Sequence, residues 1–176
     1  MKKVDLKSKI RTVPHFPKEG IMFRDITPLL NDYEAFKHSI QKFKDYYQDK
    51  KIDVIVGPES RGFIFGAVLA YELGIGFVPI RKPGKLPAEK ESQEYELEYG
   101  TDKIEIHKDA VTKGQKVLVV DDLLATGGTC EAAAKLIEKL GGEIAGFAYL
   151  IELSFLKGRE KLKGYDVYSL IDYDSE

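Results

Sequence analysis

The segment 117–129 constrains the fold of this chain more than any other. It reads Val-Leu-Val-Val-Asp-Asp-Leu-Leu-Ala-Thr-Gly-Gly-Thr. The four aliphatic residues at its start are typical of a strand buried on both faces of a parallel sheet. Asp121 and Asp122 follow, and we expect them to emerge at the carboxyl end of that strand as exposed loop carboxylates. The pattern therefore predicts an α/β domain with polar chemistry at one edge of its sheet.

Small residues continue the segment and predict an anion-binding loop. They are Ala125, Thr126, Gly127, Gly128 and Thr129. Because they carry little bulk, their backbone N–H groups can close around an anion, assisted by the threonine hydroxyls and the dipole of a following helix. The two aspartates could hold sugar hydroxyls beside this loop, since ligands of open α/β sheets bind beyond strand carboxyl ends. We predict a ribose 5-phosphate as the ligand.

Other phosphate-binding motifs do not match. No Gly-Lys-Ser/Thr follows the glycines as in a P-loop, and the Gly-x-Gly-x-x-Gly spacing of dinucleotide-binding folds is absent. An acidic turn before a helix is the competing interpretation. It does not account for the Ala-Thr-Gly-Gly-Thr continuation, and the whole segment closely resembles the PRPP-binding signature of type I phosphoribosyltransferases (PRPP, 5-phosphoribosyl 1-pyrophosphate).

Composition indicates one globular domain without a general affinity for polyanions. The 176 residues are 43% hydrophobic and 32% charged, with a formal net charge of −2, which argues against electrostatic binding of nucleic acid. Cys130 is the only cysteine, so a reducing compartment is the simpler assumption. Gly74, Gly76 and Pro79 interrupt the apolar stretch 63–80, and no signal peptide is evident. We expect a cytoplasmic protein with no membrane partner.

Apolar spacing predicts alternating strands and helices. A helix capped by Asn31 or Asp32 has a buried face formed by Phe36, Ile40, Phe43 and Tyr47. Strands are predicted at 52–56, 77–80, 117–120, 144–151 and 167–171. Further helices are predicted at 62–73 and after the glycines of the 125–129 loop. This alternation implies a mainly parallel twisted sheet flanked by helices, in one domain spanning 1–176.

Basic residues follow two of these strands and predict the place of a polyanion. Ser60 and Arg61 come after the strand 52–56, so Arg61 can face the same side of the sheet as the two aspartates. A second basic group follows the next strand and comprises Arg81, Lys82 and Lys85. Together these cations could bind one pyrophosphate from two neighbouring loops. A solvated basic loop is the alternative for the second group.

Further motifs occur in order along nearly the whole chain. They are Phe-Pro at 16–17, Gly-Ile-Met-Phe-Arg-Asp-Ile-Thr-Pro at 20–28, Glu-Ser-Arg-Gly-Phe at 59–63, Ile-Arg-Lys at 80–82, Gly-Lys-Leu-Pro at 84–87, Leu-Glu-Tyr-Gly at 97–100 and Leu-Lys-Gly-Arg-Glu at 156–160. Through these motifs the chain resembles the type I purine phosphoribosyltransferases, most closely those that use adenine. A homodimer is the quaternary structure that this resemblance implies.

The resemblance implies that residues 1–30 form a hood that recognises adenine. It assigns main-chain contacts to Met22 and Arg24, and packing against the base to Phe23 and Leu153. The carbonyl and N–H that pair with adenine would face mismatched partners in hypoxanthine, and such reversed polar pairs can discriminate by roughly 10⁴-fold.

The resemblance also implies the reaction. Adenine N9 attacks C1′ of PRPP and expels pyrophosphate, giving AMP, while Mg²⁺ is held mainly by PRPP and pyrophosphate. Asp121 and Asp122 are assigned to the ribose hydroxyls or to magnesium-bound waters. Glu98 and Tyr99 belong to a flexible lid at 81–100 that closes over the substrates, with Glu98 a candidate for handling the purine proton. A short hairpin between this segment and residues 104–107 is an option.

Several alternatives remain open at this point. Glu94, Glu96 and Glu98 alternate as in a solvated strand edge, so the lid role depends on the resemblance. Xanthine or guanine could replace adenine, although the hood and lid motifs argue against them. A non-catalytic regulator that senses PRPP or a purine while binding DNA or another protein is the alternative from a different class.

Overall fold

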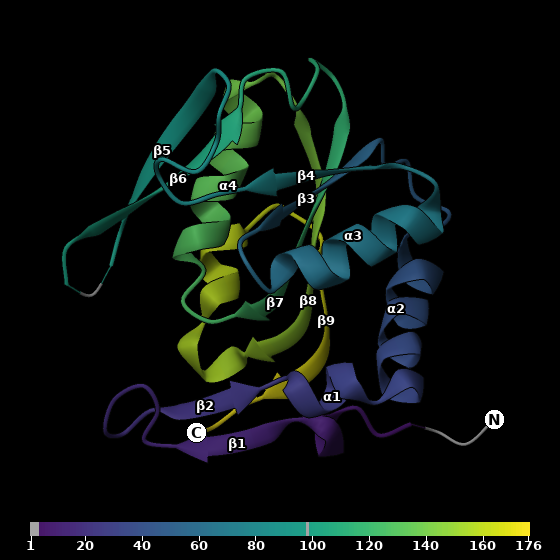
Figure 1. Ribbon diagram of the computed structural model, residues 1–176, viewed down its shortest axis with the longest axis vertical. Coiled ribbons are helices and arrows are strands. Elements are labelled where there is room, and N and C mark those ends of the chain that lie inside the picture. The colour runs from purple at the N-terminus through teal and green to yellow at the C-terminus, as the bar shows by residue number, and fades with distance from the viewer. Residues whose placement is uncertain (1–3, 98) are drawn as a thin grey trace.

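A five-stranded parallel sheet forms the centre of the computed structural model, which describes residues 4–97 and 99–176. The strand order is β4-β3-β7-β8-β9 (Figure 1). These strands are β3 (Val54–Pro58), β4 (Gly76–Ile80), β7 (Lys116–Leu124), β8 (Glu143–Leu153) and β9 (Val167–Tyr173). The predicted α/β fold with a parallel sheet is therefore confirmed.

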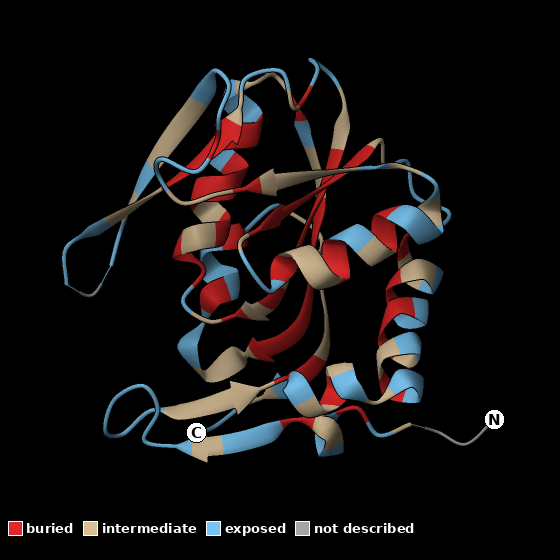
Figure 2. Ribbon diagram, in the orientation of Figure 1, coloured by how far each residue is buried: buried red, intermediate tan, exposed pale blue. Residues whose placement is uncertain are grey.

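Helices cover both faces of this sheet. The longer ones are α2 (Tyr33–Tyr47), α3 (Gly62–Leu73) and α4 (Gly128–Lys139). Alternate side chains of β7 point to opposite faces: Leu118 and Val120 pack with α2 and α3, whereas Val117 and Val119 pack with α4. Figure 2 shows the resulting buried layer on both sides of the sheet.

Local signals in the sequence account for the ends of these helices. The carboxylate of Asp32 accepts a hydrogen bond from the Ala35 N–H at 3.1 Å, so Asp32 rather than Asn31 caps α2. The helix α3 ends at Gly74, whose φ of +69° suits glycine. A short helix, α1 (Thr27–Asn31), precedes α2. Within the described residues, no helix has the length and apolarity needed to span a membrane.

The N-terminal segment forms a separate antiparallel pair below the sheet in Figure 1. It consists of β1 (Arg11–Pro14) and β2 (Met22–Asp25), preceded by the short helix η1 (Lys7–Lys9). The ring of Tyr173, at the end of β9, lies 4.4 Å from Lys7 Nζ and 4.0 Å from Arg24 Cζ. This stacking holds the N-terminal pair against the end of the central sheet.

A second antiparallel pair begins within the predicted lid and continues beyond it. It is formed by β5 (Lys90–Glu96) and β6 (Thr101–His107), paired from Lys90↔His107 to Glu96↔Thr101. The predicted hairpin between the lid segment and residues 104–107 is confirmed, although the pairing extends well beyond residues 104–107. A bridge between Arg81 and Glu105 joins the end of β4 to this hairpin.

Candidate active site

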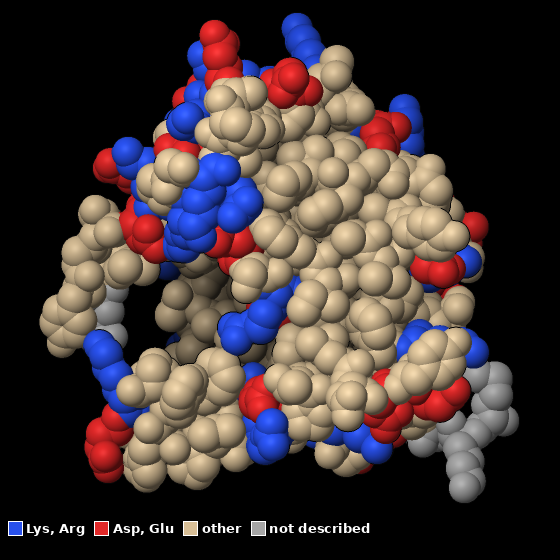
Figure 3. Space-filling model, in the orientation of Figure 1, with Lys and Arg blue, Asp and Glu red and all other residues tan. Residues whose placement is uncertain are grey.

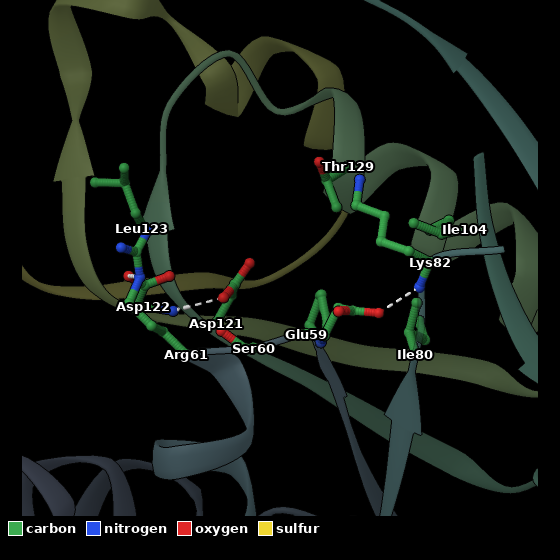
Figure 4. Close-up of a pocket in the computed structure, with 11 residues that line it drawn as sticks. Glu59, Ser60, Arg61, Ile80, Lys82, Ile104, Asp121, Asp122, Leu123 and Thr129 are labelled. Carbon is green, nitrogen blue, oxygen red and sulfur yellow. Dashed lines mark hydrogen bonds and ion pairs between the residues drawn. The ribbon is translucent and has the colours of Figure 1, made fainter. Parts of the chain in front are cut away.

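Two adjoining cavities lie at the carboxyl ends of β3 and β7. The larger, of about 430 Å³, lies among the loop after β3, the residues after β4, and β7 (Figure 4). The smaller, of about 100 Å³, is enclosed by residues 125–129, which we call the phosphate loop. Asp121, Leu123 and Thr129 line both. The predicted edge of the sheet is therefore concave and continuous with the phosphate loop.

Asp121 and Asp122 belong to β7 itself, which corrects the expectation of exposed loop carboxylates. The strand continues to Leu124 because Leu123 and Leu124 pair with Ile151 and Glu152 of β8. Asp122 is consequently buried, with 7% of its surface exposed. The Asp122 N–H donates to Oδ1 of Asp121 at 2.8 Å. Both carboxylates are fixed on a rigid strand rather than on a mobile loop.

The two carboxylates differ in their electrostatic surroundings. Burial raises the pKa of Asp121 well above its ordinary value, and the neighbouring Asp122 carboxylate raises it further. Arg61 opposes this shift only in part. Carboxylate oxygens accept hydrogen bonds from hydroxyl groups, so this pair suits the hydroxyl groups of a sugar.

Arg61 joins three parts of the molecule. Its Nε lies 2.6 Å from Oδ2 of Asp122, and its guanidinium lies 5.5 Å from the centre of the Phe23 ring. Arg61 immediately precedes α3, whereas Phe23 belongs to β2. Arg61 and the carboxylate pair thus line the same cavity, as Figure 4 shows, and the N-terminal segment reaches Arg61 through Phe23.

Glu59, which had no role in the sequence-based interpretation, lies among the predicted cations. Its carboxylate is 3.3 Å from Arg81 Nε and 2.5 Å from Lys85 Nζ, and it accepts a hydrogen bond from the Lys82 N–H at 2.5 Å. Burial alone would raise the pKa of Glu59, but the bonds from Lys85, Lys82 and Arg81 lower it to about 2. The basic group is therefore assembled around one carboxylate rather than freely solvated.

Lys82 links this basic group to the hairpin. Its Nζ contacts the Asp102 carboxylate on β6 and donates to the hydroxyl of Tyr95 on β5 at 3.0 Å. The Tyr95 hydroxyl in turn donates to Asp102 at 3.1 Å. Burial would lower the pKa of Lys82, but these contacts raise it, so the ammonium group stays charged beside the cavity.

The phosphate loop leads directly into α4. Gly127 precedes the helix with φ of +83°, and α4 begins at Gly128. A Cβ atom added at Gly127 would lie only 2.7 Å from the carbonyl oxygen of Gly158, so glycine is required for space as well as for conformation. The loop and the first turn of a 12-residue helix together form a site of the kind that binds phosphate.

The predicted base-binding residues come from two elements. Met22, Phe23 and Arg24 lie on β2, where the Phe23 ring packs edge to face against Phe16 with centroids 5.1 Å apart. Leu153 ends β8 and pairs with Tyr173, on whose ring Arg24 stacks. Tyr173 therefore connects the two halves of the predicted adenine site.

Of the two residues assigned to closing the lid, only Tyr99 is described, and it lines neither cavity. Glu98 lies outside the described residues. Tyr99 is 86% exposed near the tip of the hairpin. Ser60, Arg61 and Lys82 line the larger cavity, whereas Arg81 and Lys85 do not line it and instead form ion pairs with Glu59, which does.

Comparison with known proteins agrees with this geometry. Residues 27–174 match the model of the phosphoribosyl transferase domain. An adenine phosphoribosyltransferase from Clostridium botulinum (strain Alaska E43 / Type E3) is 62% identical over 171 residues, which cover 97% of this chain and 99% of that protein. The chain belongs to the adenine phosphoribosyltransferase family.

Solved structures of adenine phosphoribosyltransferases share the fold over almost their full length. The enzyme from Thermoanaerobacter pseudethanolicus is 61% identical with a TM-score of 0.93, and the match covers 96% of this chain and 98% of that one. The Saccharomyces cerevisiae enzyme was solved with adenine and D-2,5-dideoxy-2,5-imino-altritol 1,6-bisphosphate. It is 45% identical with a TM-score of 0.88, and the match covers 93% and 95% of the two chains.

Sequence reasoning did not assign three residues that shape this adenine phosphoribosyltransferase site: Glu59, Asp102 and Gly158. Glu59 had a signal, because it directly precedes Ser60 and Arg61 in a loop already expected at the site. Gly158 also had one, because it belongs to the Leu-Lys-Gly-Arg-Glu motif at 156–160, although no role was assigned to it. Asp102 had none, since its contact with Lys82 connects segments distant in the sequence.

Proposed function

We infer that this site transfers the 5-phosphoribosyl group from PRPP to N9 of adenine, forming AMP and pyrophosphate. The order of groups along the cavities carries this inference. A phosphate loop, a carboxylate pair and a cluster of cations follow one another, with Asp121 lining both cavities. PRPP presents its 5-phosphate, its ribose hydroxyls and its pyrophosphate in the same order.

Each group has a distinct task in the proposed reaction. Residues 125–129 bind the 5-phosphate through backbone N–H groups, and Asp121 and Asp122 hold the ribose hydroxyls. The pyrophosphate group binds to Ser60, Arg61, Arg81, Lys82 and Lys85.

In the chemical step, the bond from C1′ to the pyrophosphate oxygen breaks, and its electron pair leaves with pyrophosphate. N9 of adenine forms the new bond to C1′, and the N9 proton is released. The cations stabilise the charge that develops on the leaving group.

Mg²⁺ fits this site as a cation that arrives with the substrate. The chain offers the two carboxylates of Asp121 and Asp122, and Asp122 is already paired with Arg61. Within residues 4–97 and 99–176, no group of three or more His, Cys, Asp or Glu side chains could enclose a metal ion. We propose that PRPP and pyrophosphate supply most of the ligands, and that Asp121 and Asp122 contact magnesium-bound waters. The bound cation would neutralise the leaving group.

The proposed base site lies between the N-terminal hood and the end of β8, within one domain. Met22 and Arg24 would contact adenine through main-chain groups, and Phe23 and Leu153 would pack against its ring. The position of Phe23 beside Arg61 supports this proposal, because it places the hood next to the pyrophosphate-binding loop. Residues 81–100, with Glu98 and Tyr99, would act as the lid. Because Tyr99 is 86% exposed and lines neither cavity, this role requires Tyr99 to move toward the bound substrates.

We also propose a cytoplasmic homodimer. The helix α3 is almost entirely apolar apart from Glu72 near its end, and it exposes Ala67 and Tyr71, the latter by 84%. Figure 3 shows an extended surface without charged side chains over α3 and β4. A second copy of this chain would cover that surface. Light scattering should report a dimer, and Tyr71→Glu should shift it toward monomer; a monomeric wild-type protein would contradict the proposal.

The transfer reaction is tested by incubating the protein with PRPP, adenine and Mg²⁺. AMP and pyrophosphate should form in equal amounts, and EDTA should stop the reaction. Ribose 5-phosphate in place of PRPP should give no AMP, because it has no leaving group. Absence of AMP with the complete mixture, from protein that binds PRPP, would contradict the proposed function.

A further inference from the structure

The phosphate loop rests on the backbone of a distant segment, the short helix η3 (Gly158–Leu162). A Cβ atom added at Gly158 would lie 2.3 Å from the carbonyl oxygen of Ala125, and one added at Gly127 would lie 2.7 Å from the carbonyl oxygen of Gly158. These approaches are too close for any side chain on either glycine. The position of Gly158 therefore determines where the phosphate loop can lie.

Arg159 anchors Gly158 to the central sheet. Its Nε and Nη2 donate to the two carboxylate oxygens of Glu152 at 2.6 and 2.7 Å, and its Nη1 donates to the carbonyl oxygen of Val167 at 2.9 Å. The Ser169 hydroxyl donates to Glu152 at 2.7 Å. Glu152 is only 5% exposed, so this is a forked ion pair with one buried partner.

The anchor is connected to both ends of the phosphate loop. Glu152 pairs with Leu124, the last residue of β7 before the loop. At the far end of η3, Leu162 is buried in the same core cluster as Ala132 and Leu136 of α4, the helix that the loop enters. The ion pair is therefore connected to all three elements around the phosphate loop: β7 before it, α4 after it and η3 beneath it.

We propose that Arg159 and Glu152 position the phosphate loop through Gly158 and so set its affinity for the 5-phosphate of the substrate. Arg159 lines neither cavity, and it acts as a positioning residue. A loop already held in its binding geometry avoids the entropy cost of ordering its backbone N–H groups around the anion. The inference rests on the proposed role of residues 125–129 as the site of the 5-phosphate.

Calorimetric titration with ribose 5-phosphate and, separately, with pyrophosphate tests this proposal. Three proteins carry the relevant changes: Gly158→Ala, Arg159→Met, and the double variant Glu152→Leu with Arg159→Met. The double variant leaves no buried unpaired carboxylate, so it should fold even if Arg159→Met does not. Lys50→Met is the matched control, because Lys50 forms a 2.6 Å ion pair with Asp166 and has no contact with the phosphate loop.

We expect the Kd for ribose 5-phosphate to rise by about tenfold in all three proteins, the scale of one lost binding contact, with the Kd for pyrophosphate unchanged within about twofold. The control should bind both ligands as the wild type does. Unchanged ribose 5-phosphate affinity in the folded variants, or equal weakening of both ligands, would overturn the proposal. If either of these results is obtained while the wild type forms AMP normally, only the positioning role of Arg159 and Glu152 is overturned, and the proposed function stands. A wild type that binds neither ligand and forms no AMP would overturn the proposed function as well.

Discussion

Arg61 Nε lies 2.6 Å from Oδ2 of Asp122, so a cation before α3 and a carboxylate of β7 are paired in the lining of the larger cavity. The Arg61 side chain is 44% exposed, whereas the Asp122 side chain is 10% exposed. The exposed partner remains accessible to an incoming anion, and the buried partner fixes its position. This pair connects the sugar-binding part of the site with its pyrophosphate-binding part.

Replacing Arg61 should weaken PRPP binding selectively. In Arg61→Ala, we expect the KM for PRPP to rise by about tenfold or more, because one charge-assisted contact to pyrophosphate is lost. AMP carries no pyrophosphate, so its Kd should change little. Steady-state kinetics and AMP titration measure the two effects, with Lys44→Ala, which removes a surface ion pair to Glu72, as the control. Unchanged PRPP kinetics would remove Arg61 from the site.

Joint replacement of Asp121 and Asp122 by Asn should abolish turnover without unfolding the protein. We expect kcat to fall by on the order of 10²–10³ or more, as when preorganised polar groups are removed from an active site. Stability should be retained because burial already disfavours the charged form of Asp121, so a neutral amide relieves that penalty. A large fall in Tm would instead make the pair structural.

Glu59→Gln should alter the pH dependence of stability. The folded-state pKa of about 2 lies below the ordinary value of 4.5, so Glu59 contributes stability above pH 4.5 that is lost as the pH falls toward 2. We expect the variant to be less stable at pH 7 by on the order of 1–2 kcal/mol, after allowing for solvent screening of partly exposed partners. Urea unfolding between pH 7 and 2.5 should show this difference shrinking.

The matched control for this experiment is Glu143→Gln. Glu143 also forms an ion pair, with Lys116, but its side chain is 55% exposed. Such exposed pairs contribute little to stability, so this variant should show no comparable change with pH. If the free energy of unfolding of Glu59→Gln differs from that of the wild type by the same amount down to pH 2.5, this result would contradict the assigned role of the Glu59 carboxylate.

Tyr173→Leu should affect the adenine site rather than the PRPP site. Lys7 and Arg24 both contact the Tyr173 ring, which holds the hood against the end of β9. We expect the KM for adenine to rise about threefold to tenfold, the scale of a lost cation–π contact, with the KM for PRPP nearly constant. Tyr173→Phe keeps the ring and should behave as wild type. Equal changes in both KM values would argue against this role.

Local sequence patterns predicted most of the fold because the relevant forces are local. The aliphatic run before Asp121 and the apolar spacing of α2 determine which faces are buried, and Asp32 marks a helix start. The extent of β7 was not predictable in this way. Its pairing through Leu124 depends on β8, whose position relative to β7 is a tertiary property.

The candidate site was predicted only as far as strand ends and motifs could place it. The meeting of Arg61 with Asp122 follows from two parallel strands ending at the same edge of the sheet. The placement of Glu59 among three cationic residues and the support of the phosphate loop by Gly158 depend on contacts through space. No sequence spacing encodes such contacts.

The most direct test of the central claim supplies the purified protein with PRPP and Mg²⁺ and offers adenine, hypoxanthine, guanine and xanthine in separate reactions. Nucleotide and pyrophosphate are measured in each. The proposed site predicts AMP from adenine and no comparable product from the other bases, since their N1 and C6 groups present reversed hydrogen-bonding partners. Preferential use of guanine or xanthine would contradict the adenine assignment. No product from any base, despite measurable PRPP binding, would contradict catalysis and indicate a regulator that senses PRPP.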